Sequence, residues 1–118
     1  MQRELVNSKY IHELIDVTVD QEEFDLVSQL YDRLVASRNE FLRVSDEWLR
    51  SDQAQMTFQL HKLKNQFANL GCEAVSALLE EMYQLAKANR FSEVKTLLPR
   101  LSDLSEQTFS KLRLELSH

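Results

Sequence analysis

Apolar residues recur along this chain at alternating steps of three and four, which is the spacing of one face of an α-helix. Five segments show the pattern, and each is predicted to form an amphipathic helix. Their apolar positions are Tyr10, Ile11, Leu14 and Val17; Val27, Leu30, Leu34, Phe41, Val44 and Trp48, with polar Ser37 interrupting; Met56, Leu60, Leu63, Phe67 and Leu70; Val75, Leu78, Leu79, Met82 and Leu85 or Ala86; and Val94, Leu97, Leu101, Leu104, Thr108 and Leu112. None of these helices can bury its apolar face alone, so the pattern predicts that they pack together.

Capping residues indicate where the second and third helices begin. Asp20, with Glu23 three residues later, is typical of a capping box at the start of the second helix, which we expect to extend to about Arg50. Either Ser51 or Asp52 is expected to cap the third helix.

The later helix ends are also marked. Gly71 is predicted to end the third helix, because glycine adopts the backbone conformation that follows a helix without strain. Residues 89–91 are expected to form a turn, and Ser92 to cap the last helix. Pro99 falls inside that helix, where we expect a kink or a break.

The composition favours one helical domain. The chain has 118 residues with a single glycine and a single proline, which leaves little material for hairpin turns or flexible linkers. The connections between the helices are only a few residues long, so successive helices should be neighbours of opposite direction. We therefore predict an all-α fold over residues 1–118: an up-down-up-down antiparallel four-helix bundle with a short additional N-terminal helix.

Charge and cysteine content narrow the possible partners. The net charge of −5 argues against a nucleic-acid partner, whose phosphates need a basic surface. The single cysteine, Cys72, cannot form an internal disulfide, and no Cys/His set has zinc spacing. Because no segment resembles a signal peptide or a membrane span, we expect a cytoplasmic protein, or the soluble domain of a larger one, without a membrane partner. We also expect a monomer.

His61 is the exception in the regular pattern of the third helix. Each helical residue advances about 100°, so His61 is expected to lie roughly 140° from the core direction, with Asn65 beside it. Phe58 should point roughly 160° from the core, and Lys64, at i+3, should lie near the imidazole. With Thr57 and small Ala68 nearby, these residues predict an exposed patch that combines a nucleophile, a cation and an apolar anchor.

The residues of this patch belong to a stretch, HKLKNQFANLGC at 61–72, that resembles the signature of histidine-containing phosphotransfer domains, in which HxLKG is followed by small residues ending in ANLGA or similar. The resemblance extends over about residues 10–115. The matching residues are His61, Leu63, Lys64, Ala68, Asn69, Leu70 and Gly71. The chain departs from the pattern at Leu60, Asn65, Gln66, Phe67 and Cys72. The family usually has glycine or another small residue where this chain has Asn65, whose amide narrows the approach to the ring or donates a hydrogen bond to a phosphoryl oxygen.

The resemblance implies a phosphorelay intermediate. His61 would accept a phosphoryl group from an aspartyl phosphate on the receiver domain of a response regulator and pass it to another receiver, and a hybrid sensor kinase is a further expected partner. Lys64 would stabilise the phosphoryl charge, while Thr57, Phe58, Asn65 and Ala68 would contact the partner. A neutral imidazole is a competent nucleophile.

No cofactor is expected on this chain. Mg²⁺ should be bound by the carboxylates of the receiver, because no acidic cluster surrounds His61. No glycine-rich loop indicates an ATP site, so we expect phosphotransfer without autokinase activity.

Two alternatives remain open. The first is a non-catalytic helical adaptor that docks a response regulator or a sensor kinase without accepting phosphate. The second is a carboxylate-bridged metal bundle, since ELSH at 115–118 has the ExxH spacing of di-iron proteins, although such sites need two copies of that motif. We interpret His12 and Asp16 as helix surface and Cys72 as a small buried group.

Overall fold

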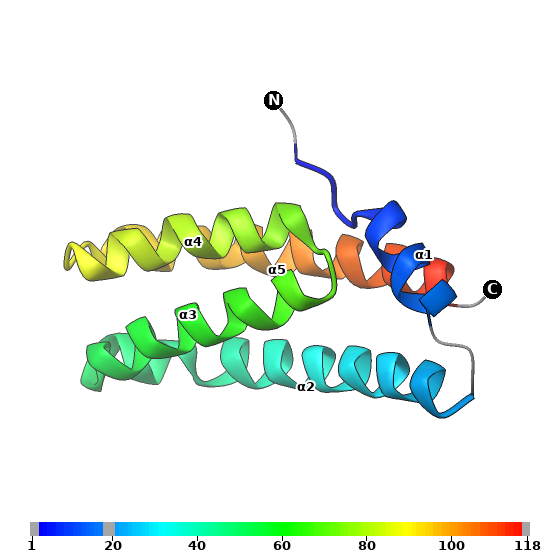
Figure 1. Cartoon of the computed structure of the whole chain (residues 1–118). Coiled ribbons are helices and arrows are strands. Elements are labelled where there is room, and N and C mark those ends of the chain that lie inside the picture. Colours follow the sequence, from blue (N-terminus) through cyan, green and yellow to red (C-terminus); the bar gives the residue numbers. More distant parts are fainter. Residues whose placement is uncertain (1–2, 18–20, 117–118) are drawn as a thin grey trace.

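The computed structural model describes residues 3–17 and 21–116, with residues 14–17 and 21–26 described as backbone only. This part of the chain is all-helical, as the sequence pattern predicts, and it contains five helices (Figure 1). The helices are α1 (Ser8–Val17), α2 (Gln21–Ser51), α3 (Gln53–Asn69), α4 (Glu73–Lys87) and α5 (Phe91–Leu116). None of the helices in the described residues is long and apolar enough to cross a membrane.

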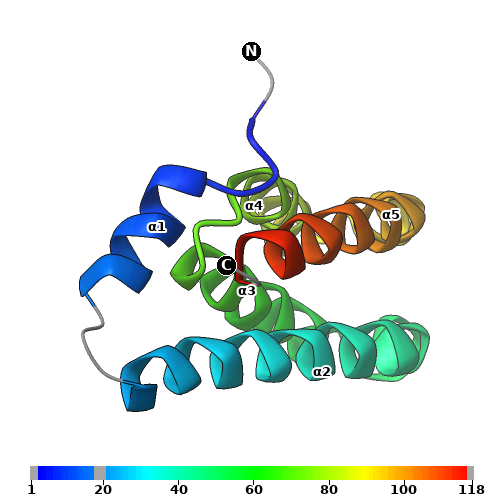
Figure 2. The ribbon, with the colours of Figure 1, turned by 90° about the vertical axis from the view of Figure 1, so that its right-hand side faces the viewer.

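The four longer helices pack along one another, and α1 lies at one end. Helix α3 contacts α2 and α4, and α5 contacts α2 and α4. Helix α1 contacts α5 and lies at the end of the molecule where α3 and α5 finish (Figure 1). Figure 2 shows this end facing the viewer, with α1 beside the turn between α3 and α4. Two backbone hydrogen bonds fix that position: the amide of Asn7 donates to the Gly71 carbonyl at 2.8 Å, and the amide of Ala74 donates to the Glu4 carbonyl at 2.8 Å.

The predicted core positions of α3 and α4 are confirmed. Every one of them is buried when Ala86 is taken as the last position of α4. In α5 the predicted residues are buried or half-buried, and Phe109, which the pattern did not include, is buried as well. The ring of Phe109 stacks on that of Phe67 in α3, with 5.7 Å between the ring centroids.

The core face of α2 differs from the prediction. Leu30 is exposed, although Val27 and Leu34 on either side of it in the predicted stripe are buried. Val44 and Trp48 are only half-buried, whereas Arg38, beside the polar interruption, is buried. The apolar stem of an arginine can fill a core position while its guanidinium hydrogen-bonds to another helix.

The ends of α3 follow the prediction. Asp52 is the N-cap, and its side chain accepts a hydrogen bond of 3.0 Å from the Gln55 amide. At the other end Gly71 has a φ angle of 70°, its amide donates to the Ala68 carbonyl at 3.0 Å, and the Cys72 amide donates to the Phe67 carbonyl at 3.0 Å. This pair of bonds is the Schellman motif, which satisfies carbonyls that the helix itself leaves unpaired.

Two features of α5 differ from the prediction: Ser92 is not its cap, and Pro99 does not break it. The helix begins at Phe91, so Ser92 lies inside its first turn, where its carbonyl accepts a hydrogen bond from Thr96 Oγ1, and does not cap it. The helix also continues through Pro99 without a break. Proline removes one intrahelical hydrogen bond and crowds the preceding turn, but α5 packs against both α2 and α4, and this packing outweighs the local cost. The proposed cap of α2 at Asp20 lies outside the described residues.

Candidate functional site

Helix α3 presents His61 to solvent from the middle of the helix. Its neighbours Leu60 and Leu63 are buried in the core, and the helical turn directs the intervening imidazole outward. Phe58, one turn earlier, has 59% of its surface exposed. The predicted directions of His61 and Phe58 are therefore confirmed.

Helix α4 contributes Tyr83 to the surroundings of His61. The two rings have centroids 5.0 Å apart and are inclined by 41°. They face each other because His61 and Tyr83 lie at equal distances in sequence on either side of Cys72, in the turn that joins α3 to α4. The sequence analysis did not identify Tyr83, although counting outward from Gly71 and Cys72 could have indicated it. One face of the imidazole is thus covered by an aromatic ring while the residue remains exposed.

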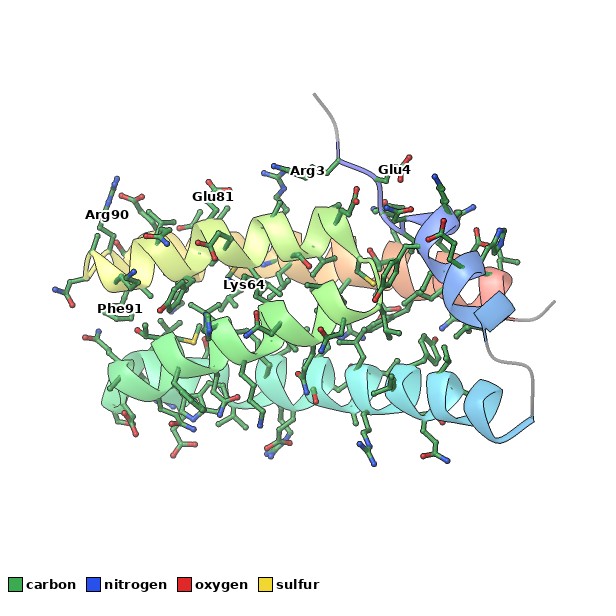
Figure 3. All side chains as sticks on the ribbon, viewed as in Figure 1. Arg3, Glu4, Lys64, Glu81, Arg90 and Phe91 are labelled. Carbon is green, nitrogen blue, oxygen red and sulfur yellow. The ribbon has the colours of Figure 1, made fainter. Side chains whose placement is uncertain are left out.

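Lys64 is near His61 but is bound to an acidic residue. Its Nζ donates a 2.8 Å hydrogen bond to Oε2 of Glu80, the residue of α4 at the matching distance from the turn. Oε1 of Glu80 accepts a second bond of 2.8 Å from Gln84 Nε2. The hydrogen bond from Lys64, followed by that from Gln84, lowers the pKa of Glu80 below its ordinary value. Lys64 therefore lies between the two helices (Figure 3) and is not a freely solvated cation.

A second lysine lies near the same aromatic ring. Lys87 Nζ is 5.1 Å from the centroid of the Tyr83 ring, and Lys64 Nζ is 5.8 Å from it. Both distances are within the range of cation–π contacts. Two ammonium groups therefore lie near the aromatic ring that contacts the imidazole, and one of them pairs with Glu80.

Asn65 contacts the nucleophilic atom of the imidazole. Its Nδ2 lies 3.4 Å from His61 Nε2, and both side chains are exposed. In the tautomer that carries its proton on Nδ1, the Nε2 lone pair accepts this hydrogen bond, which is long and therefore weak. Because both groups are exposed, water can replace the Asn65 amide when its side chain rotates away.

The other predicted contact residues lie on either side of His61 along α3. Thr57 is half-buried, and its hydroxyl donates to the Gln53 carbonyl at 3.0 Å. Ala68 is exposed and lines a shallow pocket of about 290 Å³ that also includes Tyr10 of α1. The hydroxyl of Tyr10 donates to the Asn69 carbonyl at 3.1 Å, so α1 borders the same surface.

The structure tests metal binding only for the residues that it describes. Within the described part of the chain, no group of three or more His, Cys, Asp or Glu residues could hold a metal ion. His12 pairs with Glu115, with 2.6 Å between Nε2 and Oε2, and His118 of the ExxH motif and the side chain of Asp16 lie outside the described residues. Cys72 is buried, which raises its pKa to about 12, so its thiol stays protonated.

Comparisons of this chain with protein-family models, curated proteins and solved structures gave no match.

Proposed function

We propose that this protein is a phosphorelay intermediate that accepts a phosphoryl group on His61 and passes it to a receiver domain. The observation that carries the proposal is the exposed imidazole in the middle of α3, with Lys64 one turn further on, within the HxLK and ANLG motifs at 61–71. In the same proposal, residues 1–118 form one domain of the histidine-containing phosphotransfer type. Helices α2 to α5 form its up-down-up-down antiparallel four-helix bundle, and α1 is the additional N-terminal helix.

The transfer step uses the lone pair of Nε2. In the proposed reaction Nε2 attacks the phosphorus of an aspartyl phosphate, a nitrogen–phosphorus bond forms, and the bond from phosphorus to the aspartate oxygen breaks. The leaving group is the receiver's carboxylate, and the proton on Nδ1 remains on the ring. The second half of the relay is the reverse step, with the carboxylate of another receiver as the nucleophile.

The protein's own residues position the reacting group and offset its charge. Tyr83 restricts the rotation of the imidazole by contact with its face. Lys64 and Lys87 supply positive charge on the side of α4. Phe58, Thr57 and Ala68 would contact the receiver, which would carry the Mg²⁺. We propose that the protein acts in the cytoplasm as a monomer, without autokinase activity.

A non-catalytic adaptor is the second candidate. The contact between Asn65 Nδ2 and His61 Nε2 favours it, because that amide occupies the position of the incoming phosphorus. Under this alternative the same surface would bind a receiver or a sensor kinase without covalent chemistry.

A phosphotransfer assay separates these functions. Receiver domains from the same organism, phosphorylated with radiolabelled acetyl phosphate, would be incubated with the protein. The relay predicts label that is stable in alkali and lost in acid, and that disappears in His61→Gln. The matched control is His12→Gln, which changes another exposed histidine and should keep the label. Binding of receivers without label would support the adaptor.

A further inference from the structure

The Lys64–Glu80 ion pair is a feature of the site that phosphotransfer alone does not require. A lysine whose only role was to stabilise a phosphoryl group would need no acidic partner in the unmodified protein. Here its ammonium already donates to Glu80 Oε2, and Gln84 holds the other carboxylate oxygen. The carboxylate is therefore fixed at both oxygens, facing α3.

The pair is placed where a charge on His61 would act on it. Lys64 lies one turn after His61 on the same helix, and its ammonium is 5.8 Å from the centroid of the ring that contacts the imidazole. A positive charge on His61 lowers the pKa of Glu80, so the two groups interact electrostatically in the folded protein. A phosphoryl group on Nε2 would bring negative charge into the same space.

We propose that Glu80 competes with the phosphoryl group for Lys64, and that this competition slows the phosphorylation of His61 and weakens the phosphorylated state. This inference rests on the proposed function and concerns the regulation of the same site. In the unmodified protein Glu80 holds the ammonium. When a phosphoryl group arrives at Nε2, the Lys64 side chain turns from Glu80 to a phosphoryl oxygen, and Glu80 keeps its bond from Gln84.

Because Lys64 and Glu80 are both partly exposed, breaking their ion pair costs little free energy. The side chains are 23% exposed for Lys64 and 42% exposed for Glu80, and ion pairs at such partly exposed positions stabilise a protein only weakly. A phosphoryl group carries up to about two negative charges and three acceptor oxygens, so it is the stronger ligand for an ammonium. Glu80 therefore weakens the phosphorylated state without preventing it, which suits a residue that must also give the group away.

The test uses phosphoramidate, a small donor that phosphorylates imidazoles without a protein partner. Ammonia leaves as the new nitrogen–phosphorus bond forms, and the modification of His61 is followed by peptide mass spectrometry. Glu80→Gln should increase the rate about threefold, since it releases Lys64 from its carboxylate partner. The matched control is Glu81→Gln, which makes the same change one residue later, on the outer side of α4 near Arg3 (Figure 3).

The same Glu80 substitution, made in a protein that lacks Lys64, tests whether its effect depends on that lysine. In Lys64→Met the rate should fall, and adding Glu80→Gln should then change it by less than about 1.5-fold. Equal rates for the wild type and Glu80→Gln would overturn the inference, as would an equally large effect of Glu80→Gln without Lys64. Because phosphoramidate needs no receiver, such results leave the proposed relay standing. If receivers transfer nothing while the predicted rates are observed, the relay fails and the competition stands as a property of the site.

Discussion

Arg38 and Lys64 are two cations that reach from one helix to an acidic residue on another, and they are held very differently. Arg38 of α2 has only 7% of its side chain exposed, donates to Ser105 Oγ at 3.1 Å and to Glu106, and lies 4.9 Å from the centroid of the Phe109 ring. Lys64 of α3 is 23% exposed and is held by one carboxylate and a distant ring.

The difference separates a structural cation from an exchangeable one. The side chain of Arg38 fills a core position, and its guanidinium donates to the buried Ser105 hydroxyl of α5, a partner that solvent cannot readily replace. Lys64 can exchange its partner for water or a ligand, because its ammonium lies at the surface between α3 and α4. Both residues make ion pairs, but only Lys64 is suited to change its partner during function.

The largest effect is expected from Arg38→Ala. The substitution removes the buried side chain whose guanidinium lies over the Phe109 ring and leaves a void, so the free energy of unfolding should fall by about 2 to 3 kcal/mol. Urea denaturation followed by circular dichroism measures this change. The matched control is Arg43→Ala in the same helix, whose side chain is 71% exposed and pairs with Glu40. Similar losses in the two variants would show that the burial of Arg38 contributes nothing.

An intermediate effect is expected at Glu115, a buried carboxylate on α5. Its pKa is lowered, first by the hydrogen bond from Ser8 and further by those from Lys111 and His12. A carboxyl whose pKa is lower in the folded protein stabilises it above the ordinary glutamate range, near pH 4.3, and this contribution is lost as the pH falls through the lowered value.

Glu115→Gln should therefore cost about 1 kcal/mol at pH 7, and this cost should shrink as the pH falls from 7 through the lowered pKa of the wild-type carboxyl. Denaturation midpoints of the two proteins across this range would measure the difference. The prediction is contradicted if the gap between them stays constant with pH, because the loss would then come from shape and not from charge.

The smallest change in stability is expected from Lys64→Met. Since the pair with Glu80 is partly exposed, the free energy of unfolding should change by less than about 1 kcal/mol. Receiver-dependent labelling of His61 should nevertheless slow about tenfold, because the ammonium offsets charge in the transition state. Unfolding of this variant would place Lys64 with Arg38 as a structural residue.

The sequence predicted the parts of the fold that depend on a single helix. The period of the apolar residues placed the cores of α3 and α4, Asp52 and Gly71 marked the ends of α3, and the angle per residue predicted that His61 and Phe58 are exposed. Each of these features follows from the position of a residue on its own helix, which the sequence spacing defines.

The errors arose where a second helix decides the outcome. Leu30 follows the core period of α2 but is exposed, and Arg38 departs from that period but is buried because α5 supplies its partners. Pro99 is tolerated because packing outweighs its local cost. Glu80 and Tyr83 were missed for the same reason, since their relation to His61 depends on how α4 packs against α3.

The position of the turn at Gly71 and Cys72 determines which residues of α4 lie beside His61. Gly71 also lies directly beneath Tyr10, so that a Cβ atom at this position would come within 2.8 Å of the tyrosine ring. One residue inserted in the first turn of α4 would rotate the rest of that helix by about 100° and carry Glu80 and Tyr83 away from the imidazole. Insertions and deletions at the start of α4 would therefore alter the environment of His61 more than many substitutions on the surface of the same helices.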